Sequence, residues 1–361
     1  MTQKIKQLTR YASLLLAVGM LTFLGACAPR REAINTNNDP NSTERSSNSR
    51  LDIVKQRGKL ICGVSGKLPG LSFINERGEY SGLDVDICRA LAAALFDDPT
   101  KVEFRNVSIQ ERFNALKTGE IDILSRNATW TVTRDTDVGL EFAPVVFYDG
   151  QGMMVAKNSG ITKLEDLNGR TICVKTGTTT LLNLADQMRK RNIQYNPLAI
   201  GDEDQLYNAY LQGRCQAITS DRSQLVGRRS NFPTPEEHLI LDNILSKEPL
   251  APAVVPGDPK WVDAVRWTVF ALIQAEEFGI TSENINTFAN TSDPSIKRFL
   301  GQEGSIGQNM GLTNDFAARI VKHVGNYGQV YDRNIGEPFD LDRSLNQIWT
   351  EGGLLYSPPF R

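Results

Sequence analysis

Arg134 follows a predicted buried strand, IDIL, within the polar stretch SRNATWTVTRDTD at residues 125–137. An arginine can hold a carboxylate through two parallel hydrogen bonds, and ligands of open α/β sheets gather at the carboxyl ends of strands. Thr129 and Asn127 in the same stretch add hydroxyl, amide and backbone donors. The stretch therefore favours a carboxylate-binding site, although a surface arginine on a turn would have the same local sequence.

A second polar stretch, TGTTT at residues 176–180, lies between a predicted strand and a predicted helix. Gly177 permits a tight turn, and Thr178 and Thr179 place backbone N–H groups and hydroxyls at the helix N-terminus, where anions bind well. An ordinary threonine cap would have the same sequence. The chain contains no GxxxxGKS or GxxxxGKT motif, so a nucleotide-binding loop is not supported.

A third stretch, TSDRS at residues 219–223, follows the predicted strand CQAI. It places the carboxylate of Asp221 at a strand end, where it suits a cationic ammonium group. An aspartate that caps a helix would look the same in the sequence. The functional interpretation therefore depends on whether this stretch and the Arg134 stretch face one another.

Together, the three stretches supply a carboxylate clamp and an ammonium acceptor, which are what a zwitterionic amino acid requires. Charge-assisted hydrogen bonds contribute about 1.5–3 kcal/mol each. Three or four of them can reach micromolar affinity, about −8 kcal/mol, after the entropic cost of association. Trp130 is a further candidate for packing on the ligand, although aromatic side chains more often belong to the core.

Composition argues against several other kinds of protein. The chain has only two histidines, which disfavours histidine-based catalysis and a zinc site. Its formal net charge of −2 disfavours nucleic acid as a partner. We predict no catalytic residue, no metal and no cofactor.

The N-terminus carries an export signal. Basic residues precede the apolar segment 12–24, which is too short to span a membrane comfortably. The segment ends in Leu-Gly-Ala-Cys27, which looks like a bacterial lipobox; the alternative is a plain signal peptide followed by a chance cysteine. We expect a signal peptide over residues 1–26, a lipidated Cys27 and a flexible tether over residues 27–50, which is rich in Asn, Ser, Arg and Pro.

Four cysteines remain after Cys27, and none has the CxxC spacing of a zinc ribbon or a redox motif. Export permits disulfides, and four cysteines allow three pairings. We predict the pairs Cys62–Cys88 and Cys173–Cys215, one bridge within each lobe. The alternative is four buried free thiols.

Predicted strands and helices alternate from residue 51 and then restart, which indicates two α/β lobes with mainly parallel sheets flanked by helices. A turn at residues 76–78 predicts a hairpin or two short strands. The chain crosses twice between the lobes, which gives a hinge. The predicted domains are residues 51–153 for the first part of lobe 1, residues 154–247 for lobe 2, and residues 248–361 for the second part of lobe 1 with the C-terminal helices.

Several long motifs occur in an order typical of one family: RGKLICGVSGKLPGLSF, GLDVDICRALAAALFDDPTKVEF, ERFNALKTGEIDILSRNATWTVTRDT, YDGQGMMV, VKTGTTTLLNLAD and SKEPLAPAV. They resemble the general L-amino-acid-binding proteins of polar amino-acid ABC transporters, in solute-binding protein family 3. The resemblance covers about residues 51–301. It implies the two-lobe periplasmic binding protein fold, a ligand cleft that closes on binding, and delivery of a free L-amino acid to membrane permease subunits.

The resemblance also implies a role for each site residue. Arg134 grips the α-carboxylate, and Thr129 assists it with Asn127 beside it. Thr178 and Thr179 are carboxylate donors from the second lobe. The resemblance further implies that Asp221 takes the α-ammonium.

The opening loop reads Lys67-Leu68-Pro69-Gly70, so it places no stacking aromatic, and the sequence identifies no dedicated counter-charge for a ligand side chain. We therefore expect a broad range of L-amino acids. We further expect a monomeric lipoprotein anchored through Cys27 to the lipid bilayer, in the periplasm or at the cell surface. The alternatives are a sensor or an enzyme of the same fold that acts on an amino-acid-like ligand.

Overall fold

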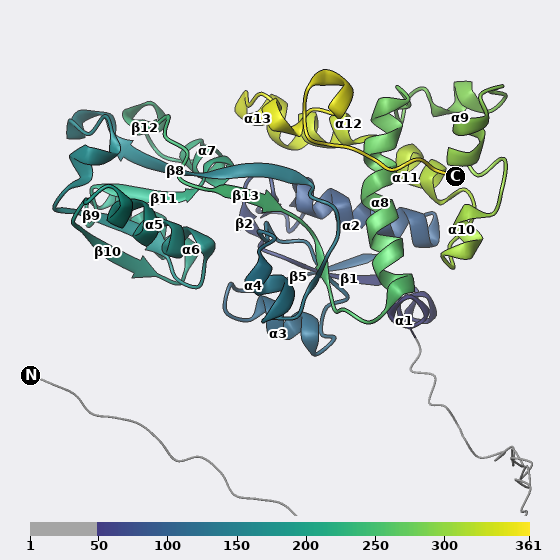
Figure 1. The fold of residues 1–361 in the computed structure, drawn as a ribbon, viewed down its shortest axis with the longest axis horizontal. Coiled ribbons are helices and arrows are strands. Elements are labelled where there is room, and N and C mark those ends of the chain that lie inside the picture. Colours follow the sequence, from purple (N-terminus) through teal and green to yellow (C-terminus); the bar gives the residue numbers. More distant parts are fainter. Residues whose placement is uncertain (1–48) are drawn as a thin grey trace, which may run out of the picture. The chain divides into compact units, whose positions relative to one another are not determined.

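Two mixed β-sheets flanked by helices organise residues 49–361, the part of the chain that the computed structural model describes (Figure 1). The expected signal peptide, Cys27 and the tether up to residue 48 lie outside these residues. Helix α1 (Arg50–Arg57) begins at the last residue of the expected tether, because Ser49 caps it by accepting a hydrogen bond from the N–H of Asp52 at 3.2 Å. Within the described range, no helix is both long enough and apolar enough to cross a membrane.

The first sheet has the strand order β5-β1-β6-β14-β7. Its strands are β1 (Leu60–Val64), β5 (Val102–Asn106), β6 (Ile123–Leu124), β7 (Glu141–Phe142) and β14 (Ala253–Val254). Strand β1 pairs in parallel with β5 and β6, and all five of its residues are buried. The helices on this side of the molecule are α2 (Leu83–Phe96), α3 (Arg112–Lys117), α4 (Val132–Thr136) and α8 (Pro259–Glu277).

The second sheet has the order β10-β9-β11-β8-β12. Its strands are β8 (Phe147–Ala156), β9 (Arg170–Lys175), β10 (Tyr195–Ile200), β11 (Ala217–Asp221) and β12 (His238–Ile240). Helices α5 (Thr179–Lys190), α6 (Glu203–Leu211) and α7 (Arg222–Arg229) accompany it (Figure 1).

The prediction of mainly parallel sheets is wrong for part of each sheet. Strand β14 is antiparallel to β6 and β7, and β8 is antiparallel to β11 and β12. The reason is that the chain crosses between the two sheets twice. Strand β8 carries the chain from the first sheet into the second, and β14 follows the return crossing, so both run opposite to their neighbours in the sheets that they enter.

Strands β8 and β13 (Lys247–Leu250) form the two crossings and pair with each other antiparallel, side by side in Figure 1. Residues from the C-terminal segment bind the chain at the start of β8. The hydroxyl of Tyr327 donates to the carbonyl of Val146 at 2.7 Å, and Asn346 accepts from the N–H of Tyr148 at 2.7 Å. The C-terminal segment therefore supports the crossing as well as the first sheet.

That C-terminal segment is helical. Its helices are α9 (Pro294–Phe299), α10 (Ile306–Asn309), α11 (Phe316–Val324), α12 (Tyr327–Tyr331) and α13 (Glu337–Phe339). Helix α11 packs on α2 and α8, and its buried residues join the same core as β1. The expectation that the chain ends in further helices is therefore confirmed.

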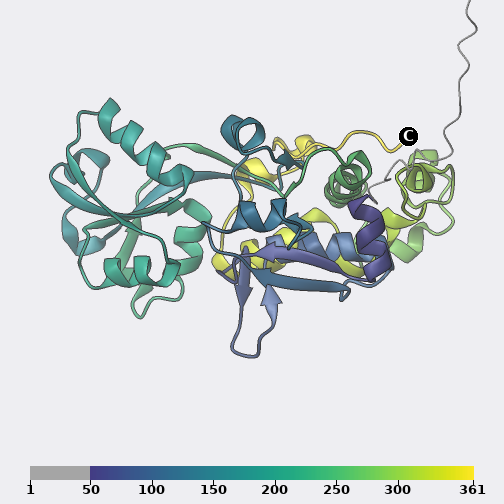
Figure 2. The same ribbon diagram turned by 90° about the horizontal axis from the view of Figure 1, so that it is seen from below.

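The predicted hairpin is also present. Strands β2 (Lys67–Leu68), β3 (Ser72–Ile74) and β4 (Tyr80–Ser81) form a small antiparallel sheet. Figure 2 shows this hairpin, in blue, extending from the rest of the first sheet's side.

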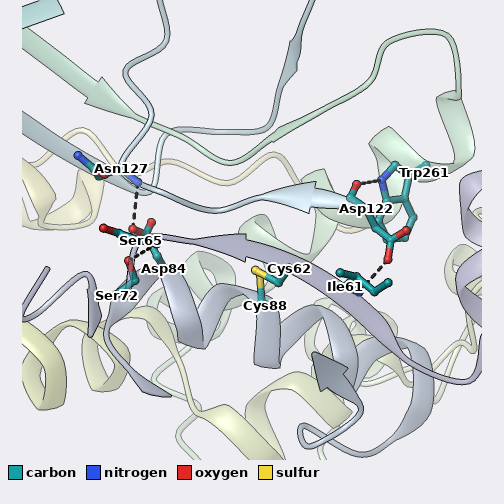
Figure 3. Close-up of a disulfide and its surroundings, with 9 residues drawn as sticks. All are labelled: Ile61, Cys62, Ser65, Ser72, Asp84, Cys88, Asp122, Asn127 and Trp261. Carbon is teal, nitrogen blue, oxygen red and sulfur yellow. Dashed lines mark hydrogen bonds between the residues drawn. A yellow bond between two sulfur atoms is a disulfide. The ribbon is translucent and has the colours of Figure 1, made fainter. Parts of the chain in front are cut away.

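Both predicted disulfides are present. Cys62 on β1 bonds to Cys88 on α2 (Figure 3), and Cys173 on β9 bonds to Cys215 just before β11. The bridged cysteines are 26 and 42 residues apart, and in a chain-entropy model loops of this size contribute about 3–4 kcal/mol each. The second bridge ties β9 to the start of β11, and the ends of both strands line the candidate site.

Candidate functional site

A narrow polar cavity lies where β6, β9 and β11 end. The segment that follows β6 and the last residues of β9 and β11 line it, so both sheets contribute to its wall through their strand ends. Six of the seven predicted ligand residues line it: Arg134, Asp221, Thr129, Asn127, Thr179 and Thr178.

Arg134 lies on the first-sheet side of the cavity, in α4. Thr131 caps this helix by accepting a hydrogen bond from the N–H of Arg134 at 3.2 Å. The guanidinium donates from Nη1 to the carbonyl of Thr129 at 2.7 Å and is 8% exposed. Burial lowers the pKa of Arg134, and the nearby carboxylates of Glu248 and Asp221 offset part of this effect. The group stays charged, and its remaining N–H donors are available to a carboxylate.

Asp221 lies opposite, at the end of β11. It occupies the residue before α7 but makes no capping hydrogen bond, so the alternative of a plain helix cap is not realised. Its Oδ2 accepts from Asn127 Nδ2 at 3.3 Å and from Gln224 Nε2 at 2.5 Å. Burial, and then the charges of Asp149 and Glu248, raise the pKa of Asp221 well above its usual range. A cation placed beside Asp221 would stabilise its ionised form and so lower this raised pKa.

Asn127 forms one of the direct links between the two sides of the cavity. Its backbone has a φ of +34°, in the left-handed region that asparagine tolerates. Its N–H donates to Asp84 Oδ2 at 3.0 Å, at the start of α2 (Figure 3). This anchor directs the Asn127 amide toward Asp221 and the cavity.

Glu248 on β13 is a residue that the sequence reasoning missed. It is 1% exposed, and its Oε2 accepts from the hydroxyls of Thr129 at 2.6 Å and Thr179 at 2.9 Å. Its Oε1 accepts from Asn183 and Ser246. A hydroxyl that donates its one proton to Glu248 offers a ligand only lone pairs. In this arrangement Thr129 and Thr179 present acceptor oxygens, not the hydroxyl donors to a carboxylate that the resemblance implies.

The start of α5 supplies backbone donors instead. Thr178 accepts from the N–H of Leu181 at 3.3 Å and donates to the carbonyl of Lys175 at 2.7 Å, so its side chain is the ordinary cap. Gly177 has a φ of +71° and makes the turn that the sequence predicts. The first N–H groups of α5 have no partner within the helix and border the cavity at Thr179 and Thr180.

Trp130 is the predicted ligand residue that does not line the cavity. Its ring stacks on Phe142 at 5.7 Å between centroids and is 40% exposed, and its Nε1 donates to Asp135. Thr129 forms a strand-like bridge with Leu250, and successive side chains of an extended segment point to opposite sides. Because Thr129 faces the cavity, Trp130 faces away.

The cavity also holds charged groups that the sequence analysis did not identify. Arg112 and Arg126 line it from the first-sheet side, and Lys175 and Glu203 line it from the second. Lys175 forms a buried ion pair with Glu203. Lys175 belongs to the stretch VKTGTTT, but a charged residue at a strand end gives no sign by itself that it will be buried.

Ion pairs also cross between the two sides at the rim. Lys67 on β2 bonds to Asp202 at 2.9 Å and Asp204 at 2.8 Å, both at the start of α6. Arg228 on α7 bonds to Asp204 at 2.8 Å and to the carbonyl of Lys67 at 3.3 Å. The hydrogen bonds to Asp204 and Asp202 raise the pKa of Lys67. These ion pairs bridge the two sides of the rim in this structure.

Two α/β lobes with a buried, charged cleft at their strand ends define a solute-binding protein. Residues 60–284 match the bacterial extracellular solute-binding proteins, family 3, and the chain belongs to this family.

Among its relatives, the chain is 49% identical over 315 residues to the general L-amino acid-binding periplasmic protein AapJ of Rhizobium johnstonii, covering 86% of this chain and 92% of that protein. It is 47% identical over 318 residues to the glutamate/glutamine/aspartate/asparagine-binding protein BztA of Rhodobacter capsulatus, covering 87% and 94%. Among solved structures, an ABC transporter periplasmic binding protein of Brucella ovis with glutathione bound superposes with a TM-score of 0.85 at 47% identity, covering 87% of this chain and 99% of that one.

Proposed function

We propose that this protein captures L-amino acids of broad side-chain range and delivers them to the permease subunits of an ABC importer. The observation that carries the proposal is that Arg134 and Asp221, two buried groups able to carry opposite charges, line the same cavity. The names of the relatives, general L-amino acid-binding and amino-acid ABC transporter-binding proteins, support the same ligand class and the same system.

The α-carboxylate of the ligand binds Arg134 and the first N–H groups of α5. The α-ammonium binds Asp221, with the hydroxyl oxygens of Thr129 and Thr179 as further acceptors. This assignment agrees with what each group can offer: N–H donors for the carboxylate, and lone pairs for the ammonium.

The ligand closes the cleft because its two charged ends bind residues on different lobes. Lobe 1 comprises residues 51–153 and 248–361, lobe 2 comprises residues 154–247, and the hinge is formed by β8 and β13. The pairing of these two strands supports the assignment, since both connections between the lobes then bend at the same place.

The protein works as a monomeric lipoprotein that Cys27 anchors to the bilayer, in the periplasm or at the cell surface. The lipobox ending in Cys27 supports the anchor. Mass spectrometry of the membrane-extracted protein should find diacylglycerol on Cys27. In cells, Cys27→Ala should move the protein from the membrane fraction to the supernatant, and equal partition of both forms would contradict the anchor.

The experiment that tests the ligand class is isothermal titration of the purified protein with each of the twenty L-amino acids and with D-alanine. We expect Kd values of micromolar or below for several unrelated side chains, and weak binding of the D-amino acid. Chromatography after overnight incubation should recover the ligand unchanged, because we propose no catalytic residue. Absence of binding with every amino acid, or conversion of one of them, would reject the proposal.

A further inference from the structure

Three glycines on the second-sheet side lie where the first-sheet side comes closest to them. One follows β9, one follows β10 and one lies within α7: Gly177, Gly201 and Gly227. A β-carbon added at these positions would lie 3.1 Å from Ile109, 3.0 Å from Gln110 and 2.7 Å from Pro69, respectively. The two sides therefore approach one another at points where the second side carries no side chain.

The contact at Gly227 is the closest and the most rigid of the three. The atom at 2.7 Å is the carbonyl oxygen of Pro69, and the next two nearest atoms, at 3.5 Å, also belong to Pro69. Real β-carbons essentially never come within 3.0 Å of another atom. Gln110, by contrast, presents the end of a flexible side chain that can rotate away. Gly227→Ala would therefore require the backbone of the turn between β2 and β3 to move.

Helix α7 itself gives no reason for a glycine at this position. Gly227 has no positive φ and lies inside the helix, where glycine is less favourable than alanine because its backbone loses more conformational freedom. The contact with Pro69 does give a reason, since a residue without a β-carbon lets another backbone approach this closely.

The turn at Pro69 and helix α7 also meet through neighbouring residues. Arg228, the next residue of α7, donates to the carbonyl of Lys67 at 3.3 Å. Lys67 lies in β2, which leads into the turn and contacts α7. Opening the cleft at β8 and β13 would separate the turn from the helix, so this contact belongs to the closed arrangement of the two sides.

We propose that Gly227 is a closure device built into α7. Its lack of a side chain lets the turn at Pro69 pack on the helix, and this contact sets how far the cleft closes and how slowly a bound amino acid leaves. The inference rests on the proposed function, since it requires that the cleft close around an amino acid. It assigns the extent of closure to a contact that is separate from the residues that bind the ligand.

The test compares the wild type with Gly227→Ala and Gly227→Leu, with L-glutamine as the ligand. Gly201→Ala is the matched control, because the Gln110 side chain can give way there. Stopped-flow tryptophan fluorescence should show similar association rates for all four proteins. The dissociation rate should be about 10-fold faster in Gly227→Ala and faster still in Gly227→Leu, because a cleft that closes incompletely releases its ligand sooner. The control should bind as the wild type does.

Small-angle X-ray scattering measures closure directly. L-Glutamine should make the wild type and the control more compact and Gly227→Ala less so. L-Alanine should dissociate faster from Gly227→Ala by the same factor as L-glutamine does, because the contact acts on closure and not on the ligand side chain. Equal dissociation rates in Gly227→Ala and the wild type, or no compaction of the wild type by its ligand, would overturn the proposal.

The melting temperature of the ligand-free protein separates closure from a scaffold role. Alanine and leucine favour a helix more than glycine does, so both variants should leave this temperature unchanged or raise it. A lower melting temperature in Gly227→Ala would overturn the proposal, since the glycine would then serve the fold itself. If the wild type binds no amino acid at all, the proposed function fails; if it binds and compacts and Gly227→Ala behaves identically, only the closure device does.

Discussion

The charges inside the cleft and the charges at its rim are organised in opposite ways. At the rim, Lys67 already has two carboxylate partners, and Arg228 has Asp204. The side chains of Lys67, Asp202 and Asp204 are 41–51% exposed. Inside, Arg134 and Asp221 are almost fully buried, and within the described part of the chain neither has an ion-pair partner.

This difference indicates that the rim charges act on the arrangement of the lobes and that the interior charges act on ligand affinity. Exposed ion pairs contribute only about 0–1 kcal/mol each, so the rim biases the lobes toward the arrangement seen here without fixing it. Buried charges without partners destabilise the empty protein, and a zwitterion that neutralises them gains from every contact. The affinity for amino acids should therefore depend strongly on the charged residues inside the cleft and weakly on those at its rim.

Arg134→Ala should produce the largest effect. It removes the guanidinium that we propose binds the α-carboxylate, and that carboxylate would then lie buried beside Asp221. We expect at least a 100-fold loss of affinity for every amino acid, from about 3 kcal/mol or more. Titration calorimetry measures the loss, and circular dichroism should show an unchanged fold. Arg170→Ala, at an exposed arginine at the start of β9, is the matched control and should bind as the wild type does.

Asp221→Asn should weaken binding by about 10- to 100-fold, because the ammonium loses a charged partner of about 1.5–3 kcal/mol. The same change should raise the melting temperature of the empty protein at pH 7. The folded-state pKa of Asp221 is raised above its unfolded value, so its ionised form destabilises the native state above that raised pKa, and the penalty disappears as pH falls below about 4. A lower melting temperature than the wild type at pH 7 would contradict the assignment of Asp221 as an uncompensated charge.

Affinity for a neutral amino acid such as alanine should fall as pH decreases, because the ammonium needs ionised Asp221 and the raised pKa of that group makes protonation easier. Asp149, whose pKa burial raises to about 6, and Glu248 face the same region. Titrations between pH 8 and pH 5 should show a several-fold loss in the wild type and a flatter profile in Asp221→Asn. Parallel profiles for the two proteins would assign the pH dependence to another group.

The sequence predicted the part of the site that repeats a local pattern and missed the part that depends on packing. Arg134, Thr178 and Asp221 line the cavity, and each was predicted because it follows a strand and lies near the start of a helix or turn. Glu248 was missed because nothing local to β13 marks a carboxylate that will receive hydroxyls from both lobes. The outward position of Trp130 depends on the pairing of Thr129 with Leu250, 121 residues along the chain, which periodicity does not reveal.

The same limit applies to the fold. The restart of the strand–helix pattern predicted two lobes, and the cysteine positions predicted both disulfides. The antiparallel strands were missed, because β14 is only two residues long and its direction follows from the second crossing and not from its own sequence.

Lys67→Met tests the rim and should produce the smallest effect. The change removes two exposed ion pairs and leaves Asp202 and Asp204 as neighbouring like charges, with Arg228 still bound to Asp204. We expect affinity for amino acids to fall by no more than about threefold, and the difference from the wild type to disappear at about 1 M salt, where surface charges are screened. Lys190→Met, at an exposed lysine of α5, is the control. A loss of 30-fold or more that persists at high salt would mean that the rim takes part in binding as directly as the interior does.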